Sequence, residues 1–414
     1  MREMKDSGIA WIGAMPRAWK MNTIAQIFLQ VKCKNTGLQE KNLLSLSYGK
    51  VKRKSIDTVE GLLPESFDGY NIIEKDDIVL RLTDLQNDHT SLRVGLAEER
   101  GIITSAYLTI RNRSNFCPKY LYYYLHSFDI AKGFYGMGAG VRQGLNWDGV
   151  KWLKILAPLV PEQERIAAFL DAECAEIDAV LEKTRASIEE YKKLKQAVIT
   201  QAVTKGIRGD RPMKDSGIEW IGEIPAEWSV VPFSKFARVS ANLVNPSDYQ
   251  DYLQVSPENI EKDSGKLLPC KTVSEVGVES WNHFFHKGQI LYSKIRPKLN
   301  KVCIAPFDGL CSADMYPIDT DNISKFVVYT ILSNDFNQQV AMITENRVKM
   351  PKINQKELSK IIVVLPANRM EQQEIVDYLD GECGKIDALV AKKQQYLTEI
   401  ENYKKSLIYE YVTG

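Results

Sequence analysis

The chain has 414 residues, of which 44% are hydrophobic, and a formal net charge of +1. A chain of this length is expected to form two or more domains, each with enough apolar side chains for a core. The small net charge excludes a strongly basic or acidic field over the whole protein, so binding to nucleic acid would depend on local groups of charge. No stretch approaches the roughly 20 consecutive apolar residues of a membrane span.

Two parts of the sequence recur at a constant distance. Residues 4–19 read MKDSGIAWIGAMPRAW, and residues 213–228 read MKDSGIEWIGEIPAEW. Residues 162–204 are matched in the same way by residues 371–413. Both pairs are 209 residues apart (213 minus 4, and 371 minus 162). The sequence therefore predicts two equivalent halves, each with a leading segment, a globular region and a long repeated stretch.

The repeat also predicts the domain boundaries. Glycines and a proline in Lys205–Pro212 end the first repeated stretch, and the second ends at Gly414 where that connector would begin. We therefore expect the two termini to lie close together. The expected domains are a leading segment with the first globular domain at 1–160, the first repeated helix at 161–205, a connector with the second leading segment and globular domain at 206–370, and the second repeated helix at 371–414.

Each repeated stretch is predicted to be one long helix. Apolar residues recur at alternating spacings of four and three, the a and d pattern of a coiled coil, and glycine and proline are nearly absent from the interiors. We expect the two helices to pair with each other, although each apolar stripe could instead pack only on its own globular domain. The residues expected at the helix-helix seam are Leu170, Ile177, Leu181, Ile188, Ile386, Val390, Leu397 and Ile400.

The heptads also predict how the helices pair. Two equivalent halves related by a pseudo-twofold axis require antiparallel helices, in which an a position faces a d position. The alignment that matches these positions puts Leu170 opposite Lys404 and Ile188 opposite Ile386. The pair would then be an intramolecular spacer whose length sets the distance between the two globular domains.

Short runs of β-branched and aromatic residues alternate with Gly, Asp and Asn in both globular regions. The expected fold class is α+β: two globular mixed α/β domains, separated by two long helices that pair as an antiparallel intramolecular coiled coil, in a pseudo-twofold repeat. The expected strands are 43–48, 77–82 and 102–110 in the first region and 252–255, 288–293, 301–305 and 312–317 in the second. The expected helices are 118–127 and 324–333.

The sequence offers little for catalysis or metal binding. Its four histidines are scattered, and no thiol or carboxylate cluster joins the pair His283 and His286. The glycine-rich run at 136–140 follows an aromatic segment rather than a strand, and no G-x-x-x-x-G-K-[ST] loop is present. The seven cysteines form no C-x-x-C pair, which favours reduced thiols in a cytoplasmic protein. We expect no catalytic residue and no metal site.

Loops rich in basic and amide side chains are the best candidates for a binding surface. Arg and Lys can pair with phosphates or guanine, Asn and Gln with adenine, and Tyr can stack on bases. One such loop alone would be a solvated surface as often as a site, but five loops occur at matched places in the two halves. The candidate DNA-binding residues are Tyr48, Lys50, Lys52, Arg53, Lys54, Arg81, Asp84, Gln86, Asn87, Arg142, Gln143, Lys294, Arg296, Lys298, Asn300, Arg347 and Lys349.

Several stretches together resemble the specificity subunits of type I restriction-modification systems. They are PLVPEQERIAAFLD at 158–171, its echo LPANRMEQQEIVDYLD at 365–380, VLRLTDLQND at 79–88 and GQILYSKIRPKLNKVCIA at 288–305. The resemblance covers essentially the whole chain. The longer Pro to Glu-Gln link in LPANRMEQQE departs from the family pattern.

The resemblance implies a non-catalytic reader of double-stranded DNA. Each globular region would be a target-recognition domain for one half of a bipartite target, and the helices would set the spacing between the halves. Two methyltransferase subunits would dock on the helices, and restriction subunits would join the full complex. The chain would then need no cofactor of its own, since S-adenosylmethionine, ATP and Mg would bind partner subunits.

Two other kinds of protein fit the sequence. One is a coiled-coil scaffold that binds proteins through its two domains without contacting DNA. The other is an enzyme whose site is built from unrecognised residues. Salt-dependent DNA binding that weakens when Arg53, Arg81 or Arg296 is changed would favour the DNA reader over the scaffold. Methyl transfer by the isolated chain would favour the enzyme.

Overall fold

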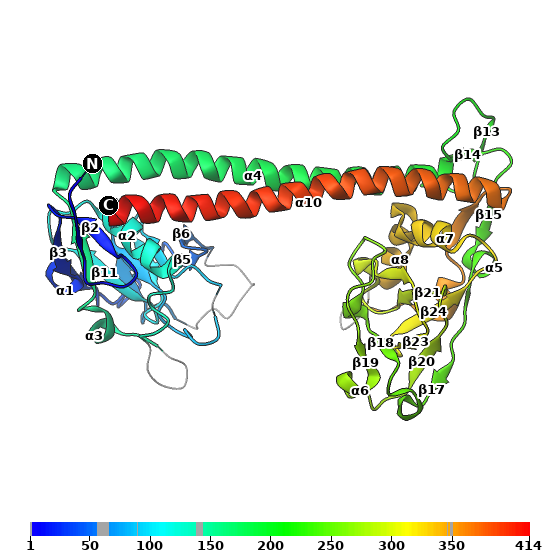
Figure 1. Ribbon diagram of the computed structural model, residues 1–414, viewed down its shortest axis with the longest axis horizontal. Helices are drawn as coiled ribbons and strands as arrows, with labels where there is room; N and C mark the ends of the chain where they lie inside the picture. Colours follow the sequence, from blue (N-terminus) through cyan, green and yellow to red (C-terminus); the bar gives the residue numbers. More distant parts are fainter. Residues whose placement is uncertain (1, 56–65, 89, 138–143, 346, 348–350) are drawn as a thin grey trace. The chain divides into compact units, whose positions relative to one another are not determined.

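The computed structural model describes residues 2–55, 66–88, 90–137, 144–345, 347 and 351–414. The chain divides into two compact units, each containing one globular domain and parts of both long helices (Figure 1). Unit 1 consists of Met1–Thr184 with Gln395–Gly414, and unit 2 consists of Arg185–Gln394. The division crosses both long helices, because each end of the helix pair packs on a different globular domain.

Unit 1 is built around an antiparallel four-stranded sheet, with smaller two-stranded pairs beside it. The sheet has the order β4 (Phe28–Gln30), β11 (Leu108–Asn112), β8 (Ile78–Leu80) and β9 (Val94–Leu96). The pairs are β1 (Met4–Asp6) with β2 (Ala14–Pro16), β3 (Lys20–Thr23) with β12 (Lys154–Ala157), β5 (Leu44–Ser47) with β6 (Lys50–Arg53), and β7 (Asn71–Ile73) with β10 (Gly101–Ile103). The helices of the domain are α1 (Ile24–Ile27), α2 (Pro118–Ile130) and α3 (Trp147–Val150).

Unit 2 repeats the four-stranded sheet and adds a mixed five-stranded one, in which β18 and β23 run parallel. The four-stranded sheet has the order β16 (Arg238–Val239), β24 (Met315–Asp319), β21 (Ile290–Ser293) and β22 (Val302–Ile304). The second has the order β17 (Leu243–Val244), β20 (Asn282–Phe285), β23 (Gly309–Cys311), β18 (Leu253–Val255) and β19 (Lys271–Thr272). The remaining pairs are β13 (Met213–Asp215) with β14 (Glu223–Pro225) and β15 (Ser229–Pro232) with β25 (Ile362–Leu365). The helices are α5 (Phe233–Phe236), α6 (Val273–Val276), α7 (Ser324–Leu332), α8 (Asn334–Thr344) and α9 (Gln355–Leu358), with short 3-10 turns at Pro246–Tyr249, Pro257–Asn259 and Pro297–Leu299.

The expected strand at 102–110 is wrong. Residues 101–103 form β10, which pairs with β7, and residues 108–112 form β11 in the central sheet. A turn closed by the Tyr107 amide on the Thr104 carbonyl separates them. Polar and small residues at 104–106 give this turn, and its two flanking strands therefore belong to different sheets.

The two repeated stretches are the helices α4 (Val160–Lys205) and α10 (Arg369–Thr413). Of the seam residues expected from the heptads, Leu170, Ile177, Leu181, Ile188 and Ile386 are buried. Val390, Leu397 and Ile400 are half-buried. Among the described residues, no helix is long and apolar enough to cross a membrane.

The helices pair antiparallel in each unit, but not in the alignment expected from the heptads. In unit 1 Lys404 lies 2.6 Å from Asp178, where the heptad alignment placed it opposite Leu170. In unit 2 Lys195 lies 2.8 Å from Asp387. Both contacts displace the pairing by about one heptad. The expected alignment would place the Lys404 ammonium against a leucine, with no acceptor for its charge. The observed alignment is favourable because it gives each lysine a carboxylate partner.

Each leading segment closes on the start of a long helix through the same contacts. In unit 1 the Trp19 indole Nε1 donates to the Glu162 carboxylate at 3.2 Å, and Arg2 forms an ion pair with the same group at 2.7 Å. Gly414 lies against Pro16, so the C-terminus meets the leading segment as expected. Unit 2 repeats the tryptophan bond and the ion pair with Trp228, Arg211 and Glu371.

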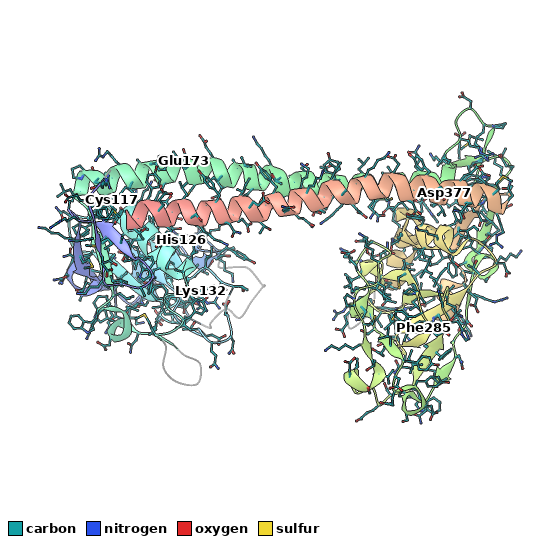
Figure 2. The ribbon with its side chains drawn as sticks, viewed as in Figure 1. Cys117, His126, Lys132, Glu173, Phe285 and Asp377 are labelled. Atoms are coloured by element: carbon teal, nitrogen blue, oxygen red, sulfur yellow. The ribbon has the colours of Figure 1, made fainter. Side chains whose placement is uncertain are left out.

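Each globular domain is held on its helix by a second repeated set of bonds. At the start of α2, the Cys117 amide donates to the Gln163 side chain at 3.0 Å, beside α4 (Figure 2). One turn further, Lys119 and the Tyr123 hydroxyl both contact the Asp171 carboxylate. The equivalent groups in unit 2 are Ile323 with Gln372, and Lys325 and Tyr329 with Asp380.

Candidate nucleic-acid interface

The hairpin of β5 and β6 carries a cluster of basic side chains in the first domain. Its tip is Tyr48 and Gly49, both with positive φ, and the Tyr48 side chain is 88% exposed. Lys50 and Lys52 are exposed, whereas Lys54 is half-buried. Arg53 is exposed but forms an ion pair with Glu99, which raises the pKa of the guanidinium and lowers that of the carboxyl; two of its nitrogens reach the two carboxylate oxygens.

The loop after β8 is shaped by Arg93, a buried residue that the sequence did not single out. Its guanidinium donates to the backbone carbonyls of Arg81, Thr83, Asp84 and Asp88, and so ties both arms of the loop together. The positive charge of Arg93 is also balanced in part by two carboxylates, Asp129, which accepts a hydrogen bond from the Arg93 amide, and Asp88.

The side chains of this loop are partly engaged with one another. Arg81 is half-buried and lies 3.4 Å from the Asp88 carboxylate, whose pKa is well below its usual range because Ser91 donates hydrogen bonds to it. Asn87 is exposed and donates to Asp84 at 2.8 Å, and Gln86 is exposed as well.

Contacts bring these loops of unit 1 together. A Cβ at Gly49, in the hairpin tip, would lie 3.1 Å from Leu92, at the end of the Arg93 loop. The Leu145 amide donates to the Leu82 carbonyl at 2.8 Å, which joins the segment before α3 to the same loop. Residues 47–54, 81–88, 90–93 and 144–146 therefore form one surface of the domain. Two residues predicted at this surface, Arg142 and Gln143, lie outside the described residues.

The loop after β21 occupies the equivalent position in unit 2. The Ile353 amide donates to the Lys294 carbonyl at 2.9 Å, as Leu145 does to Leu82, and Ile295 bridges to Lys352. Residues 293–301 and 351–354 therefore lie together.

The side chains of this second loop differ in how far they reach the surface. Arg296 and Lys298 are exposed, and Arg296 has a positive φ that turns it outward from the end of the strand. Lys294 is partly engaged, with its Nζ bonded to the Ala313 carbonyl and 5.4 Å from the Tyr316 ring. Arg347 pairs with Glu357, which raises the pKa of the guanidinium. Lys349 lies outside the described residues.

Asn300 is a correction to the predicted surface. Its side chain is only 1% exposed and donates to the Leu332 carbonyl at 3.2 Å, at the start of the turn that leads into β22. A buried amide that supports the loop from within is not accessible to a base. We therefore remove Asn300 from the candidate contacts.

Two lysines that the sequence did not single out lie on the same side of unit 2. The turn closed by the bridge between Ile260 and Leu267 carries Lys262 and Lys266, both exposed. This turn contacts the β21 loop through the Asp263 amide and the Asn300 carbonyl. The sequence of the turn, EKDSGKL, is that of an ordinary charged turn, so its place beside the β21 loop can be recognised only in the structure.

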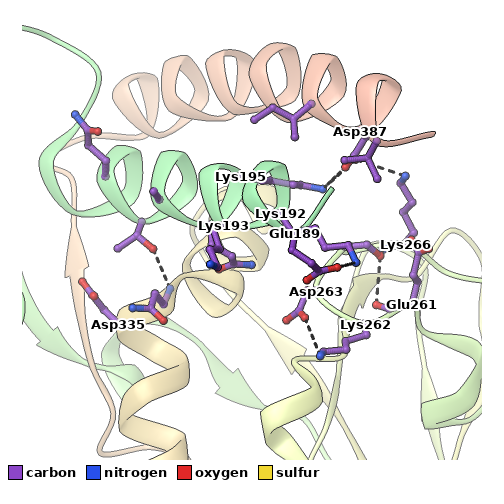
Figure 3. A pocket seen from close by; sticks show the side chains of 18 of the residues that line it. Glu189, Lys192, Lys193, Lys195, Glu261, Lys262, Asp263, Lys266, Asp335 and Asp387 are labelled. Carbon is purple, nitrogen blue, oxygen red and sulfur yellow. Dashed lines mark hydrogen bonds and ion pairs between the residues drawn. The ribbon is translucent and has the colours of Figure 1, made fainter. Parts of the chain in front are cut away.

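In each unit, a groove separates the globular domain from the paired helices. The groove of unit 2 has a volume of about 1350 Å³ and is lined by both helices, the 261–266 turn and the start of α8 (Figure 3). Lys192, Lys193 and Lys262 are exposed on its walls, and each forms an ion pair with a neighbouring carboxylate. The groove of unit 1, of about 520 Å³, is lined by the β5–β6 hairpin tip, α2 and both helices. Within the described residues, no group of three or more His, Cys, Asp or Glu side chains is placed to hold a metal ion.

Comparisons with known proteins agree with this architecture. Residues 235–402 match the family model of the type I restriction modification DNA specificity domain. The chain is 34% identical over 275 residues to the type I restriction enzyme EcoDI specificity subunit of Escherichia coli, and the match covers 62% of this chain and 61% of that relative.

One of the solved structures supports the fold at a TM-score above one half. A chain from a structure of a type I R-M system, described for its complex assembly and conformational transition, has a TM-score of 0.69 at 15% identity and covers 96% of this chain and 98% of its own length. The HsdS subunit from Thermoanaerobacter tengcongensis gives a TM-score of 0.46 at 14% identity, with 97% and 98% of the two chains covered. The matched domain and the sequence relative make this chain similar to specificity subunits of type I restriction-modification systems, although it spans only about three fifths of the relative's length, and the solved chain with a TM-score of 0.69 has the same fold.

Proposed function

We propose that this chain is the DNA-recognition subunit of a type I restriction-modification complex and that it is not itself an enzyme. In this proposal each globular domain is a target-recognition domain that reads one half of a bipartite target in double-stranded DNA. The observation that carries it is the clustering, in both units, of exposed basic loops at the same end of a four-stranded sheet. Matched loops of different sequence suit two domains that read different bases.

The residues proposed to contact DNA divide by exposure. Lys50, Lys52, Arg296 and Lys298 are exposed and suit phosphate or guanine contacts, and Tyr48 offers an open ring. Arg53, Arg81 and Arg347 each have a carboxylate partner, which a phosphate could replace. The rest of the proposed set is Lys54, Asp84, Gln86, Asn87 and Lys294.

Methyltransferase subunits are the proposed partners of the long helices. On α10, Leu389, Tyr396 and Tyr403 are exposed and recur at heptad spacing, so they lie along one face of the helix. On α4, Val180 and Leu194 are exposed at the positions equivalent to Leu389 and Tyr403. An apolar stripe outside the seam suits helices of a partner chain. We propose two methyltransferase subunits, with restriction subunits in the full complex, in a cytoplasmic assembly.

The chemistry of the complex belongs, in this proposal, to the partner subunits. S-adenosylmethionine would bind the methyltransferase subunits, and ATP and Mg the subunits that drive restriction. The chain would supply the position on DNA at which those subunits act.

Mapping of methylated bases tests the proposal directly. The chain is produced with its methyltransferase subunits in a host without other methylation, and the methylated positions of the host DNA are sequenced. We expect one asymmetric bipartite motif. Arg53→Ala and Arg81→Ala should weaken methylation at sites defined by the first half of the motif, and Arg296→Ala at sites defined by the second.

Lys385→Ala is the matched control, because Lys385 is exposed on α10 and its side chain bonds Glu382 of the same helix. This variant should methylate as the wild type does. A chain that supports no methylation pattern, or Arg53→Ala and Arg296→Ala variants with unchanged patterns and salt-independent binding, would favour the protein-binding scaffold. Methyl transfer by the chain without partners would favour an enzyme.

A further inference from the structure

A carboxylate on a long helix holds two lysines in unit 1. One oxygen of Asp178, on α4, accepts a hydrogen bond from Lys404 of α10 at 2.6 Å. Its other oxygen lies 3.5 Å from the Nζ of Lys50, at the start of β6 in the recognition domain. The carboxylate therefore joins three parts of the unit at the mouth of its groove: both helices and the basic hairpin.

Unit 2 contains the same arrangement. Asp387, now on α10, accepts hydrogen bonds from Lys195 of α4 at 2.8 and 2.9 Å. The Nζ of Lys266, from the 261–266 turn of the recognition domain, lies 3.5 Å from the same carboxylate (Figure 3). Both distances to the recognition-domain lysine are thus equal in the two units.

Lys50 and Lys266 are not equivalent positions of the sequence repeat. The aspartates and the helix lysines are equivalent positions of the two halves, 209 residues apart. Lys50 is not equivalent to Lys266, because the residue 209 positions after it is Asn259. A hairpin in one domain and a longer turn in the other bring a lysine to the equivalent carboxylate, although the two segments differ in length and sequence.

Exposure separates the roles of the two lysines. Lys404 and Lys195 are 23% and 12% exposed, so each is a mostly buried partner that neutralises the aspartate. Lys50 and Lys266 are 64% and 60% exposed and lie farther from the carboxylate. Two lysines on one carboxylate leave a net positive charge, and an exposed ion pair of this length is weak. Lys50 or Lys266 can therefore leave the carboxylate for another anion with a small loss of free energy.

We propose that Asp178 and Asp387 are exchangeable partners of Lys50 and Lys266, and that each holds its lysine in the free protein and releases it to a phosphate of bound DNA. In the free protein each aspartate occupies the place of a phosphate, and on binding a phosphate takes over Lys50 or Lys266. The lysine of the neighbouring helix, Lys404 or Lys195, stays bonded to the aspartate, so the exchange leaves the helix seam unchanged. The inference rests on the proposed function and adds a contact made where each recognition domain meets the helices.

Binding of the full chain to a short DNA duplex of arbitrary sequence, measured by fluorescence anisotropy over a range of salt concentrations, tests the exchange. Lys50→Ala should weaken binding and lower the slope of log K against log salt by about 1, as expected for one lost phosphate contact. Asp178→Asn removes the competing carboxylate, so it should tighten binding by about two- to fivefold, the ratio that an exposed ion pair is worth.

The double variant Lys50→Ala/Asp178→Asn should bind DNA like Lys50→Ala, because the tighter binding expected of Asp178→Asn requires the Lys50 side chain. Asp387→Asn and Lys266→Ala repeat the test in the other unit and replace the first set if Asp178→Asn disturbs folding, as judged by circular dichroism. Aspartate variants that bind DNA as tightly as the wild type or more weakly, with normal lysine effects, would overturn the exchange alone. Salt-independent or absent binding of the wild type, alone and with methyltransferase subunits, would count against DNA recognition itself.

Discussion

His126 shows how burial at a single residue makes the stability of unit 1 depend on pH. The ring stacks on Tyr122 beneath the β5–β6 hairpin, and among the described residues its Nδ1 has no hydrogen-bond partner. Burial, with a smaller effect of Lys404, lowers the pKa of His126 to about 4 from its ordinary 6.5. The folded protein therefore keeps the imidazole neutral at pH values where the unfolded chain protonates it.

The sign of the effect follows from proton uptake. The unfolded state binds more protons between pH 6.5 and 4, so the contribution of His126 is fully present above pH 6.5 and lost as the pH falls toward 4. Asp129 acts in the opposite direction: burial raises its pKa to about 6, and its contribution is present at low pH and lost as the pH rises through 6. The two effects partly cancel between pH 4 and 6, so the wild type alone would hide both.

A His126→Phe variant separates them. Relative to pH 7, the wild type should lose up to about 3 kcal/mol of unfolding free energy at pH 4 through this histidine, and the variant should not. The measurement is chemical denaturation of both proteins at several pH values. His286→Phe is the control, because that histidine is exposed in unit 2. A pH dependence that is the same in wild type and His126→Phe would contradict the assignment.

Elements were easier to predict from sequence than their contacts. The long helices are determined by residues within them: apolar heptads, few breakers, and Gly206 directly after the end of α4. Their alignment depends instead on charges in the partner helix. Heptad matching placed Lys404 opposite Leu170, but its contact with Asp178 selects a different pairing.

The candidate residues of the interface also divide into those set by local sequence and those set by contacts in the fold. Clustered basic loops could be predicted because their composition is local, as in the hairpin with Lys50 and Lys52. The burial of Asn300 and the role of Arg93 could not, because both depend on how the backbone folds: Asn300 bonds the Leu332 carbonyl, and Arg93 bonds carbonyls that the fold of its own loop turns toward it. Lys266 was missed for the same reason, since its importance lies in a carboxylate more than a hundred residues away in sequence.

The bonds between recognition domain and helix predict an effect at the level of elements. The Tyr123 hydroxyl donates to Asp171 at 2.9 Å, and burial with this bond raises the tyrosine pKa far above its usual value. Tyr123→Phe leaves the packing but removes a bond to a charged group, so it should lower the unfolding free energy by about 1.5–3 kcal/mol. Tyr329→Phe should do the same through Asp380.

Amide hydrogen exchange shows which elements lose stability in these two variants. Tyr123→Phe should speed amide exchange in α2 and the adjoining part of α4, and Tyr329→Phe in α7 and the adjoining part of α10, because each bond belongs to one unit. Tyr396→Phe, at an exposed position of α10, is the control and should leave exchange unchanged. Equal acceleration in both units by either variant would show that the docking bonds are not local.

For the whole molecule, the repeat makes helix length a property that can be changed without touching either recognition surface. Asp178 with Lys404 and Asp387 with Lys195 hold the helix pairing within each unit, and α4 and α10 each continue from one unit into the other. An insertion between these fixed points should therefore move the recognition domains as intact bodies.

One heptad inserted after Ala186 and another after the equivalent Gln395 keeps every seam contact and both exposed stripes in phase. The added helix is about 10 Å long, which corresponds to about three base pairs of duplex. With the methyltransferase subunits present, sequencing of methylated DNA should show the same two half-sites separated by about three more base pairs. A heptad in only one helix is the control, since it breaks the pairing and should abolish methylation. Altered bases within either half-site, or an unchanged spacing in the doubly extended chain, would show that the helices do not set the distance.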